Sequence, residues 1–192
     1  IDAIQWNGTT NAPRAAPQTN QFTVLKFMNQ SARLYGLDLS GRMPLAKTGL
    51  GEFGLKGLLN YTNGRNRDTG DGLYNIMPLN AKLALTQKRG GWDNAAELVM
   101  VSRKDDVSDM RNEMETAGYA LVNLRGSHSW KKVRLDFGVE NVLDRLYYHP
   151  LGGAYLGQGT TMTTQAVPTV PQWGTPVPGM GRSIYTALNV QF

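Results

Sequence analysis

The segment that decides the fold class runs Phe53-Gly-Leu-Lys-Gly-Leu-Leu-Asn-Tyr61. Its odd-numbered positions are aromatic, aliphatic or glycine, whereas its even-numbered positions include Lys56 and Asn60. Successive side chains of a β-strand point to opposite faces of the sheet, so a period of two residues is typical of a strand with one apolar and one polar face.

The same alternation recurs along most of the chain. It is clear in residues 79–86, 92–103, 120–125, 133–140 and 184–192. An earlier long strand is expected over roughly residues 22–40, with an irregular first half, and the opening residues 1–6 resemble the end of a strand. We therefore expect an all-β fold with about seven full strands and one partial strand at the start.

The connections between these strands alternate in length. Residues 89–91 and 129–131 form tight turns, whereas residues 62–77, 105–115 and 144–181 form long loops. Short turns at one end and long loops at the other are typical of an outer-membrane β-barrel. The polar face then lines a wet lumen. The apolar face, with an aromatic girdle of Trp92, Tyr61, Tyr35 and Phe192, contacts lipid.

Composition excludes several other classes of protein. The 192 residues contain no cysteine, which rules out a disulfide scaffold, a thiolate zinc site and a cysteine nucleophile. No apolar run approaches the roughly 18 residues of a membrane-spanning helix. The net charge of +5 is modest and dispersed, so no nucleic-acid partner is expected.

The width of the barrel is indicated by small residues on the polar face. A complete eight-stranded barrel must fill its interior with side chains. Small inward residues fit a wider barrel better, and here they include Gly54, Ala84, Ala95, Gly138 and Ala187. The chain also opens Ile1-Asp2-Ala3 without a methionine or a signal peptide, which favours the C-terminal part of a longer protein.

Two further stretches carry a family resemblance. The run Gly138-Val-Glu-Asn-Val-Leu-Asp-Arg-Leu-Tyr-Tyr148 resembles the G-x-x-N-L-F-D-x-x-Y stretch of TonB-dependent outer-membrane receptors, with Asn141, Leu143, Asp144 and Tyr147 at matching positions. Val142 stands where the family usually has Leu. Residues 181–192, which end in Phe192, resemble the family's terminal assembly signal, and residues 73–78 resemble the start of a family strand.

The resemblance implies the architecture of the whole receptor. Residues 1–192 would form a transmembrane antiparallel β-barrel segment, about the last seven or eight strands of a 22-stranded barrel. The plug, the TonB box and the first strands would lie outside this chain. The last strand should pair with the first strand of the barrel.

The resemblance also implies function and partners. Such receptors bind scarce cargo outside a Gram-negative bacterium, and the TonB-ExbB-ExbD complex of the inner membrane acts on the plug to release it inward. The implied partners are that complex, the remainder of the barrel and plug, outer-membrane lipid and lipopolysaccharide, and a metal or metal chelate. Binding and release are non-covalent, so no enzyme activity and no built-in cofactor are expected.

The terminal loop narrows the expected cargo. Residues 149–162 and 178–183 are similar to the copper-receptor branch of the family, the OprC/NosA type. Thioether sulfur suits Cu(I) and imidazole suits copper in either state, so His149, Met162 and Met180 are the candidate metal residues. Methionine as adaptable packing is the alternative. Met110 and Met114, in an acidic loop, are weaker candidates.

Other functional interpretations remain open from the sequence. A ferric siderophore is the alternative cargo, and a small independent eight-stranded adhesin or a soluble carrier is the alternative protein. Ser127-His128-Ser129 has no positioned acid, and the glycines of residues 152–159 do not join a strand to a helix, so catalysis and phosphate binding are disfavoured. The inward charges are expected to pair across strands or to contact the plug: Lys56, Lys82, Glu97, Arg125, Arg134, Asp136 and Glu140.

Overall fold

The computed structural model describes residues 2–5, 23–26, 29–108, 111, 113–154 and 175–191. Expectations placed on Trp6, Phe22, Met110, Met162 and Phe192 lie outside these residues. In the described part, no helix is long and apolar enough to cross a membrane.

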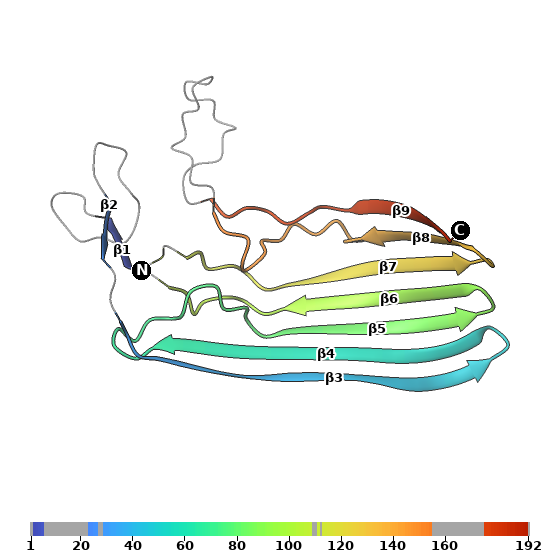
Figure 1. Ribbon diagram of the computed structural model, residues 1–192, viewed down its shortest axis with the longest axis horizontal. Helices are drawn as coiled ribbons and strands as arrows, with labels where there is room; N and C mark the ends of the chain where they lie inside the picture. The colour runs from blue at the N-terminus through green and yellow to red at the C-terminus, as the bar shows by residue number, and fades with distance from the viewer. Residues whose placement is uncertain are drawn as a thin grey trace, which may run out of the picture.

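The described chain is built from β-strands, as predicted. Two short strands, β1 (Asp2–Gln5) and β2 (Thr23–Lys26), pair antiparallel with each other. Seven strands form the main antiparallel sheet in sequence order (Figure 1). They are β3 (Ala32–Thr48), β4 (Gly51–Asn66), β5 (Asn80–Arg89), β6 (Trp92–Val101), β7 (Tyr119–Ser129), β8 (Val133–Glu140) and β9 (Ser183–Val190).

The boundaries of β3 differ from the strand expected over residues 22–40. The structure divides that region into β2 and β3, and β3 continues to Thr48. The pairing of β3 with β4 continues to Thr48 through a β-bulge, at which the register shifts between Pro44 and Ala46. The extra residue, Leu45, breaks the period-two pattern while the ladder continues, and a proline is tolerated at such an interruption.

The two ends of the sheet differ as the loop lengths predicted. Residues 49–50, 90–91 and 130–132 form the three short turns at one end, where the C-terminus also lies (Figure 1). The long connections, residues 67–79, 102–118 and 141–182, leave the opposite end. This confirms the predicted difference in loop length between the two ends of the sheet, which we call the short-turn end and the long-loop end.

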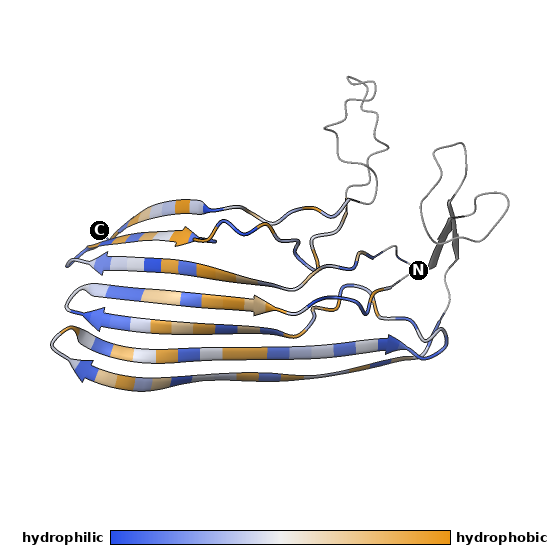
Figure 2. Ribbon diagram, turned by 180° about the vertical axis from the view of Figure 1, so that it is seen from behind, coloured by the Kyte–Doolittle hydropathy of each residue, from blue (hydrophilic) through white to orange (hydrophobic). Residues whose placement is uncertain are grey.

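Strand register places apolar and polar side chains on separate faces. One row across the sheet aligns Leu39, Leu59, Ala81, Met100 and Ala120. A second row, three residues along each strand and on the other face, aligns Arg42, Lys56, Ala84, Glu97 and Asn123. Hydrophobic and hydrophilic bands accordingly alternate along the strands (Figure 2). We call these sides the apolar face and the polar face.

The apolar face is uncovered. Its exposed large side chains include Leu37, Met43, Leu83, Leu85, Leu124, Phe137, Ile184 and Leu188. Aromatic side chains lie near both of its ends: Tyr35 and Tyr61 contact each other near the long-loop end, and Trp92 lies at the short-turn end. The buried apolar core of the described residues is confined to Val101, Tyr119 and Leu121, so the sheet is not one half of a packed sandwich.

The main sheet is open. Its order runs from β3 to β9, and within the described residues these two edge strands pair with no further strand. A complete eight-stranded barrel would join its first and last strands, since closure removes the edges. The sheet therefore has the form of a wall segment.

We predict that Gly51, in the first short turn, is required for the β3–β4 hairpin. Its φ of 124° is unfavourable for other residues, and an added Cβ would clash with the carbonyl oxygen of Lys88. Gly51→Ala in the full-length protein should lower the free energy of unfolding by about 1–3 kcal/mol, measured by urea titration of tryptophan fluorescence. Gly49→Ala is the control, because nothing lies within 4 Å of its added Cβ. Equal stability of the two variants would contradict the prediction.

Candidate functional site

The candidate site is the long-loop end of the sheet, where three connections meet. Isolated backbone bridges fix the base of each: Gly72 pairs with Arg65 at the end of β4, Lys104 pairs with Thr116, and Tyr148 pairs with Pro178. Buried polar side chains add two junctions at these bases.

A buried ion pair is the centre of the first junction. Lys104 Nζ lies 2.6 Å from Glu113 Oε1, and the two side chains are only 2% and 7% exposed. Lys104 also donates to the carbonyl oxygen of Ile76 at 2.8 Å. Glu113 accepts from the backbone N–H groups of Asn75 and Ser108, each at 2.9 Å. A buried ion pair stabilises only when such additional hydrogen bonds complete it, as they do here.

This ion pair connects two different loops. Ile76 and Asn75 belong to the loop of residues 67–79, whereas Lys104, Ser108 and Glu113 belong to the loop of residues 102–118. Close packing supports the junction, since a Cβ on Gly72 would lie 2.8 Å from the carbonyl oxygen of Val107. The two loops therefore form one unit, which we call the loop clamp.

A second junction forms around Asn141, directly after β8. This residue is 2% exposed and has a φ of 49°, a conformation that asparagine tolerates better than most residues. Its side chain donates to the carbonyl oxygens of Arg145 and Met180, and accepts from the N–H of Arg145 at 2.9 Å. Its own N–H donates to Asn123 Oδ1 on β7. Asn141 thus ties the end of β8 to β7 and to the segment that precedes β9.

Asp144 and Tyr147 complete this junction. Asp144 Oδ1 accepts from the N–H of Arg182 at 2.8 Å, just before β9 begins. The ring of Tyr147 packs against Tyr119 and lies so close to Gly179 that no side chain fits there. The family-like motif is therefore structural in this chain, as the sequence indicated: its polar members satisfy backbone groups at a strand exit.

The candidate metal residues lie beside this second junction. His149 is exposed, and its Nδ1 accepts from the N–H of Leu151 at 3.2 Å. Met180 is 65% exposed, and its carbonyl oxygen is held by Asn141. Tyr148 and Pro178 form an isolated antiparallel bridge, and His149 and Met180 lie on opposite sides of it, one and two residues along their segments, which separates them by about 10 Å. The structure does not bring these two residues together, and Met162 lies outside the described residues.

Other metal and catalytic arrangements gain no support from the described residues. There, no three His, Cys, Asp or Glu side chains gather as a metal site. Ser127 and His128 alternate along β7 and so lie on opposite faces. The His128 ring lies between Trp92 and Trp130, with ring centroids 4.6 and 4.4 Å away, so it belongs to the aromatic group at the short-turn end.

The polar face carries the cross-strand pairs that the sequence predicted for part of its charges. Arg125 lies 3.5 Å from both Glu97 and Glu140, on the two neighbouring strands. Asn123 donates to Glu97 at 3.0 Å. Arg134 pairs with Asp136, two residues along the same strand. Lys56 and Lys82 make no ion pair among the described residues.

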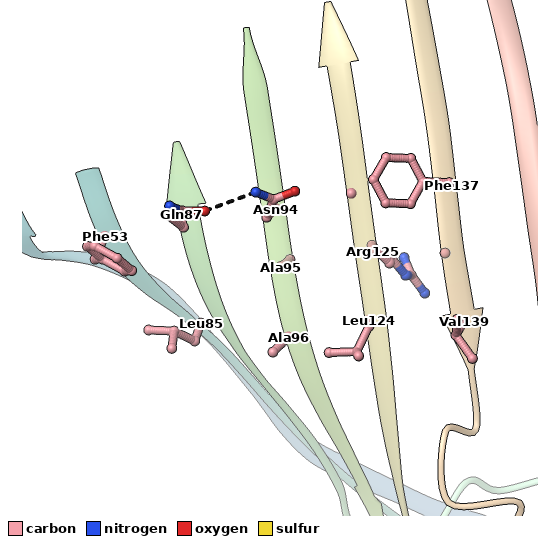
Figure 3. A pocket seen from close by; sticks show the side chains of 12 residues that line it. Phe53, Leu85, Gln87, Asn94, Ala95, Ala96, Leu124, Arg125, Phe137 and Val139 are labelled. Carbon is pink, nitrogen blue, oxygen red and sulfur yellow. Dashed lines mark hydrogen bonds between the residues drawn. The ribbon is translucent and has the colours of Figure 1, made fainter. Parts of the chain in front are cut away.

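A shallow groove of about 450 Å³ lies mainly on the apolar face (Figure 3). Phe53 and Phe137 stand at its two sides, and Ala96 and Leu124 lie between them (Figure 3). Its polar pair is satisfied internally, because Asn94 donates to Gln87 at 2.9 Å. An apolar groove on the face predicted to contact lipid is suited to hydrocarbon, so the long-loop end remains the candidate site.

Sequence reasoning missed the loop clamp. Arg103 and Lys104 are adjacent cations in an acidic loop, and only Lys104 is buried. Arg103 instead makes an exposed pair with Glu115 at 3.2 Å. The chain contains no local signal that distinguishes these two residues, because the choice depends on which of them faces the neighbouring loop.

We predict that Glu113→Gln in the full-length protein opens the loop clamp. Removing one partner of a buried ion pair typically costs about 3–5 kcal/mol, and residues 71–79 and 102–116 should lose protection from amide hydrogen exchange. Arg103→Met is the matched control, because an exposed pair contributes at most about 1 kcal/mol. If both variants exchange like the wild type, the loop clamp does not hold the loops.

We predict that Asn141→Gly loosens the second junction. Glycine keeps the positive φ but removes the side-chain hydrogen bonds to the backbone of Arg145 and Met180. Each buried backbone group that loses its partner in this way costs about 1–3 kcal/mol of stability. Hydrogen exchange should accelerate in residues 141–148 and 179–183. Leu143→Ala, at a 69% exposed position, is the control. Unchanged exchange in Asn141→Gly would refute this role.

Comparisons with known proteins agree with this architecture. The family model described as TonB dependent receptor-like, beta-barrel, matches residues 2–142. Among solved structures, the copper transporter OprC is similar, with a TM-score of 0.72 and 24% sequence identity over 85% of this chain. The chain spans 24% of the OprC chain, and that likeness concerns the fold. No curated protein matches.

The family match extends from β1 to just beyond the end of β8. The family and structural matches both agree with an open, two-faced sheet of seven antiparallel strands. Membership in a receptor family also confirms the expectation that the chain is not an enzyme. This chain belongs to the TonB-dependent receptor-like β-barrel family.

Proposed function

We propose that this chain is a C-terminal wall segment of a TonB-dependent transporter in the outer membrane of a Gram-negative bacterium, and that the transporter takes up copper or a copper chelate. The observation that carries the proposal is the two-faced seven-stranded sheet, whose fold resembles the copper transporter OprC. Every backbone polar group in a bilayer must be paired, and a sheet satisfies this requirement only as part of a closed barrel. The remaining wall, the plug and the TonB box belong to other parts of the receptor, where TonB-ExbB-ExbD would act.

The second junction supports His149 and Met180 as residues that meet copper. The backbone at Met180 is held by Asn141 while its side chain is exposed, so the thioether extends from a fixed point. At His149 the Nδ1 accepts from the backbone N–H of Leu151, so the neutral ring carries its proton on Nε2. A metal would bind this exposed imidazole at Nδ1 in place of that N–H, or at Nε2 after the proton has moved to Nδ1. These two residues and Met162 supply soft sulfur and imidazole ligands suited to Cu(I). Because His149 and Met180 lie on opposite sides of the bridge between Tyr148 and Pro178, they would bind with groups from elsewhere in the receptor.

The proposal is tested by copper titration of the full-length receptor. The variants His149→Ala, Met162→Leu and Met180→Leu should each weaken Cu(I) binding by roughly tenfold, about 1.4 kcal/mol, as measured by competition with a chromogenic chelator. Met43→Leu is the control, since this methionine is exposed on the apolar face. Wild-type copper affinity in all three variants would remove these residues from the site. Failure of the wild type to bind copper, combined with binding of a ferric siderophore, would replace the cargo.

A further inference from the structure

The groove on the apolar face changes in chemical character along the strands that form it. Three successive rows on this face pair β5 with β6. From the short-turn end inwards, these rows are Arg89 with Trp92, Gln87 with Asn94, and Leu85 with Ala96. The second row lies between the rings of Phe53 and Phe137 (Figure 3). From the turns into the sheet, the apolar face thus presents a cation, then amides, then hydrocarbon.

The cation of the first row has no acidic partner. Arg89 is exposed and forms no ion pair with another described residue. The acidic residues nearest this end each pair with another cation already: Glu52 with Lys47, Asp93 with Lys88, and Asp136 with Arg134. Lys131 and Lys132, in the turn between β7 and β8, are also exposed and form no ion pair within the described chain. The short-turn end therefore carries an excess of positive charge.

The amides of the second row are held at a fixed depth. Gln87 Nε2 donates to the carbonyl oxygen of Leu50 at 2.7 Å, and Asn94 Nδ2 donates to Gln87 Oε1 at 2.9 Å. Each amide nitrogen carries a second N–H that can donate to a further acceptor. The rise of a strand places these amides roughly 7 Å along the chain from Arg89. A polar level therefore lies between the cation and the apolar part of the groove.

The apolar part of the groove depends on small residues. Leu85 and Leu124 are exposed there, with Ala96 between them (Figure 3). Next to them, a Cβ added to Gly126 would overlap the ring of Phe137. The ring thus occupies the space that a side chain at residue 126 would need, and the groove stays open beside it. Such a surface favours a hydrocarbon chain.

We propose that this groove is a binding site for one anionic glycerophospholipid. Arg89 pairs with the phosphate, Gln87 and Asn94 face the glycerol esters, and an acyl chain lies against Ala96 and Leu124. The order of groups in such a lipid is phosphate, ester and hydrocarbon, which is the order of the three rows. The site differs from general lipid contact along the apolar face, because it selects the charge of the headgroup.

The interfacial position of Trp92 agrees with this depth. Tryptophan is enriched where a membrane meets water, at the level of the headgroups. The unpaired cations nearby favour a headgroup with net negative charge, since each lysine or arginine near an anionic membrane surface contributes about 1 kcal/mol. A second copy of the chain is disfavoured as the occupant, because it would bring the unpaired cations of two short-turn ends together.

The position of the site also favours a phospholipid over lipopolysaccharide. Outer-membrane barrels have short turns on the periplasmic side and longer loops outside the cell. The leaflet on the periplasmic side consists of phospholipid, and Arg89 lies at the short-turn end. This argument rests on the proposed function, because it requires the orientation of an outer-membrane barrel.

The experiment is native mass spectrometry of the full-length receptor, delipidated in detergent and titrated with phosphatidylglycerol, phosphatidylethanolamine or lipid A. We expect one phosphatidylglycerol molecule to bind more tightly than either other lipid. Arg89→Gln should weaken its binding by roughly tenfold, because a charged hydrogen bond is lost. Ala96→Phe should block the groove.

Two matched variants serve as controls. Arg33→Gln removes an exposed arginine from the same face at the long-loop end. Ala120→Phe adds a ring to the same face outside the groove. Both should bind phosphatidylglycerol like the wild type, because neither position lines the groove.

Four results would overturn the lipid site. They are equal affinity for the two phospholipids, unchanged binding in both Arg89→Gln and Ala96→Phe, preferential binding of lipid A, and a receptor dimer that Ala96→Phe abolishes. Copper affinity of the same preparations separates this proposal from the proposed function, since the candidate copper residues lie at the long-loop end. A receptor that binds copper but not phosphatidylglycerol refutes the lipid site alone. A receptor that binds phosphatidylglycerol but not copper refutes the copper cargo alone.

Discussion

Backbone hydrogen bonding between neighbouring strands is the constraint on which the rest of the structure depends. Seven strands pair in sequence order, so both edges of the sheet remain unpaired within the described residues. In a bilayer an unpaired edge costs several kcal/mol for each polar group. The same ladder fixes which residues share a face, because each side chain alternates with its neighbour. Closure by the rest of a barrel and separation into two faces are therefore consequences of one interaction.

The long loops extend this constraint beyond the strands. Backbone groups that leave the ladder still need partners when they are buried. Glu113 accepts from two backbone N–H groups, and the Asn141 side chain binds both the backbone N–H and the carbonyl oxygen of Arg145. The loop clamp and the second junction thus continue the role of the ladder with side chains. The bases of the long loops are therefore ordered by contacts within the chain itself.

The sequence predicts the elements that repeat and misses those that depend on a neighbour. Strict alternation in residues 53–61 and 133–140 indicates β4 and β8, because a strand's pattern is local. The end of β3 is less visible, since Leu45 in the bulge shifts the period. The structural role of Asn141 can be read from its chemistry. The burial of Lys104 cannot, because it depends on a loop about 30 residues earlier in the chain.

The two faces and the loops assign different chemistry to different parts of the wall. The apolar face contains satisfied polar groups such as Gln87 and Asn94, so it can remain in contact with hydrocarbon. An exposed imidazole and an exposed thioether, those of His149 and Met180, lie beside the second junction at the long-loop end. The polar face instead carries charges that pair across neighbouring strands, because register sets Arg125 between Glu97 on β6 and Glu140 on β8. The chemistry of each region is thus set by the strand ladder for the faces, and by side-chain contacts to backbone groups for the loops.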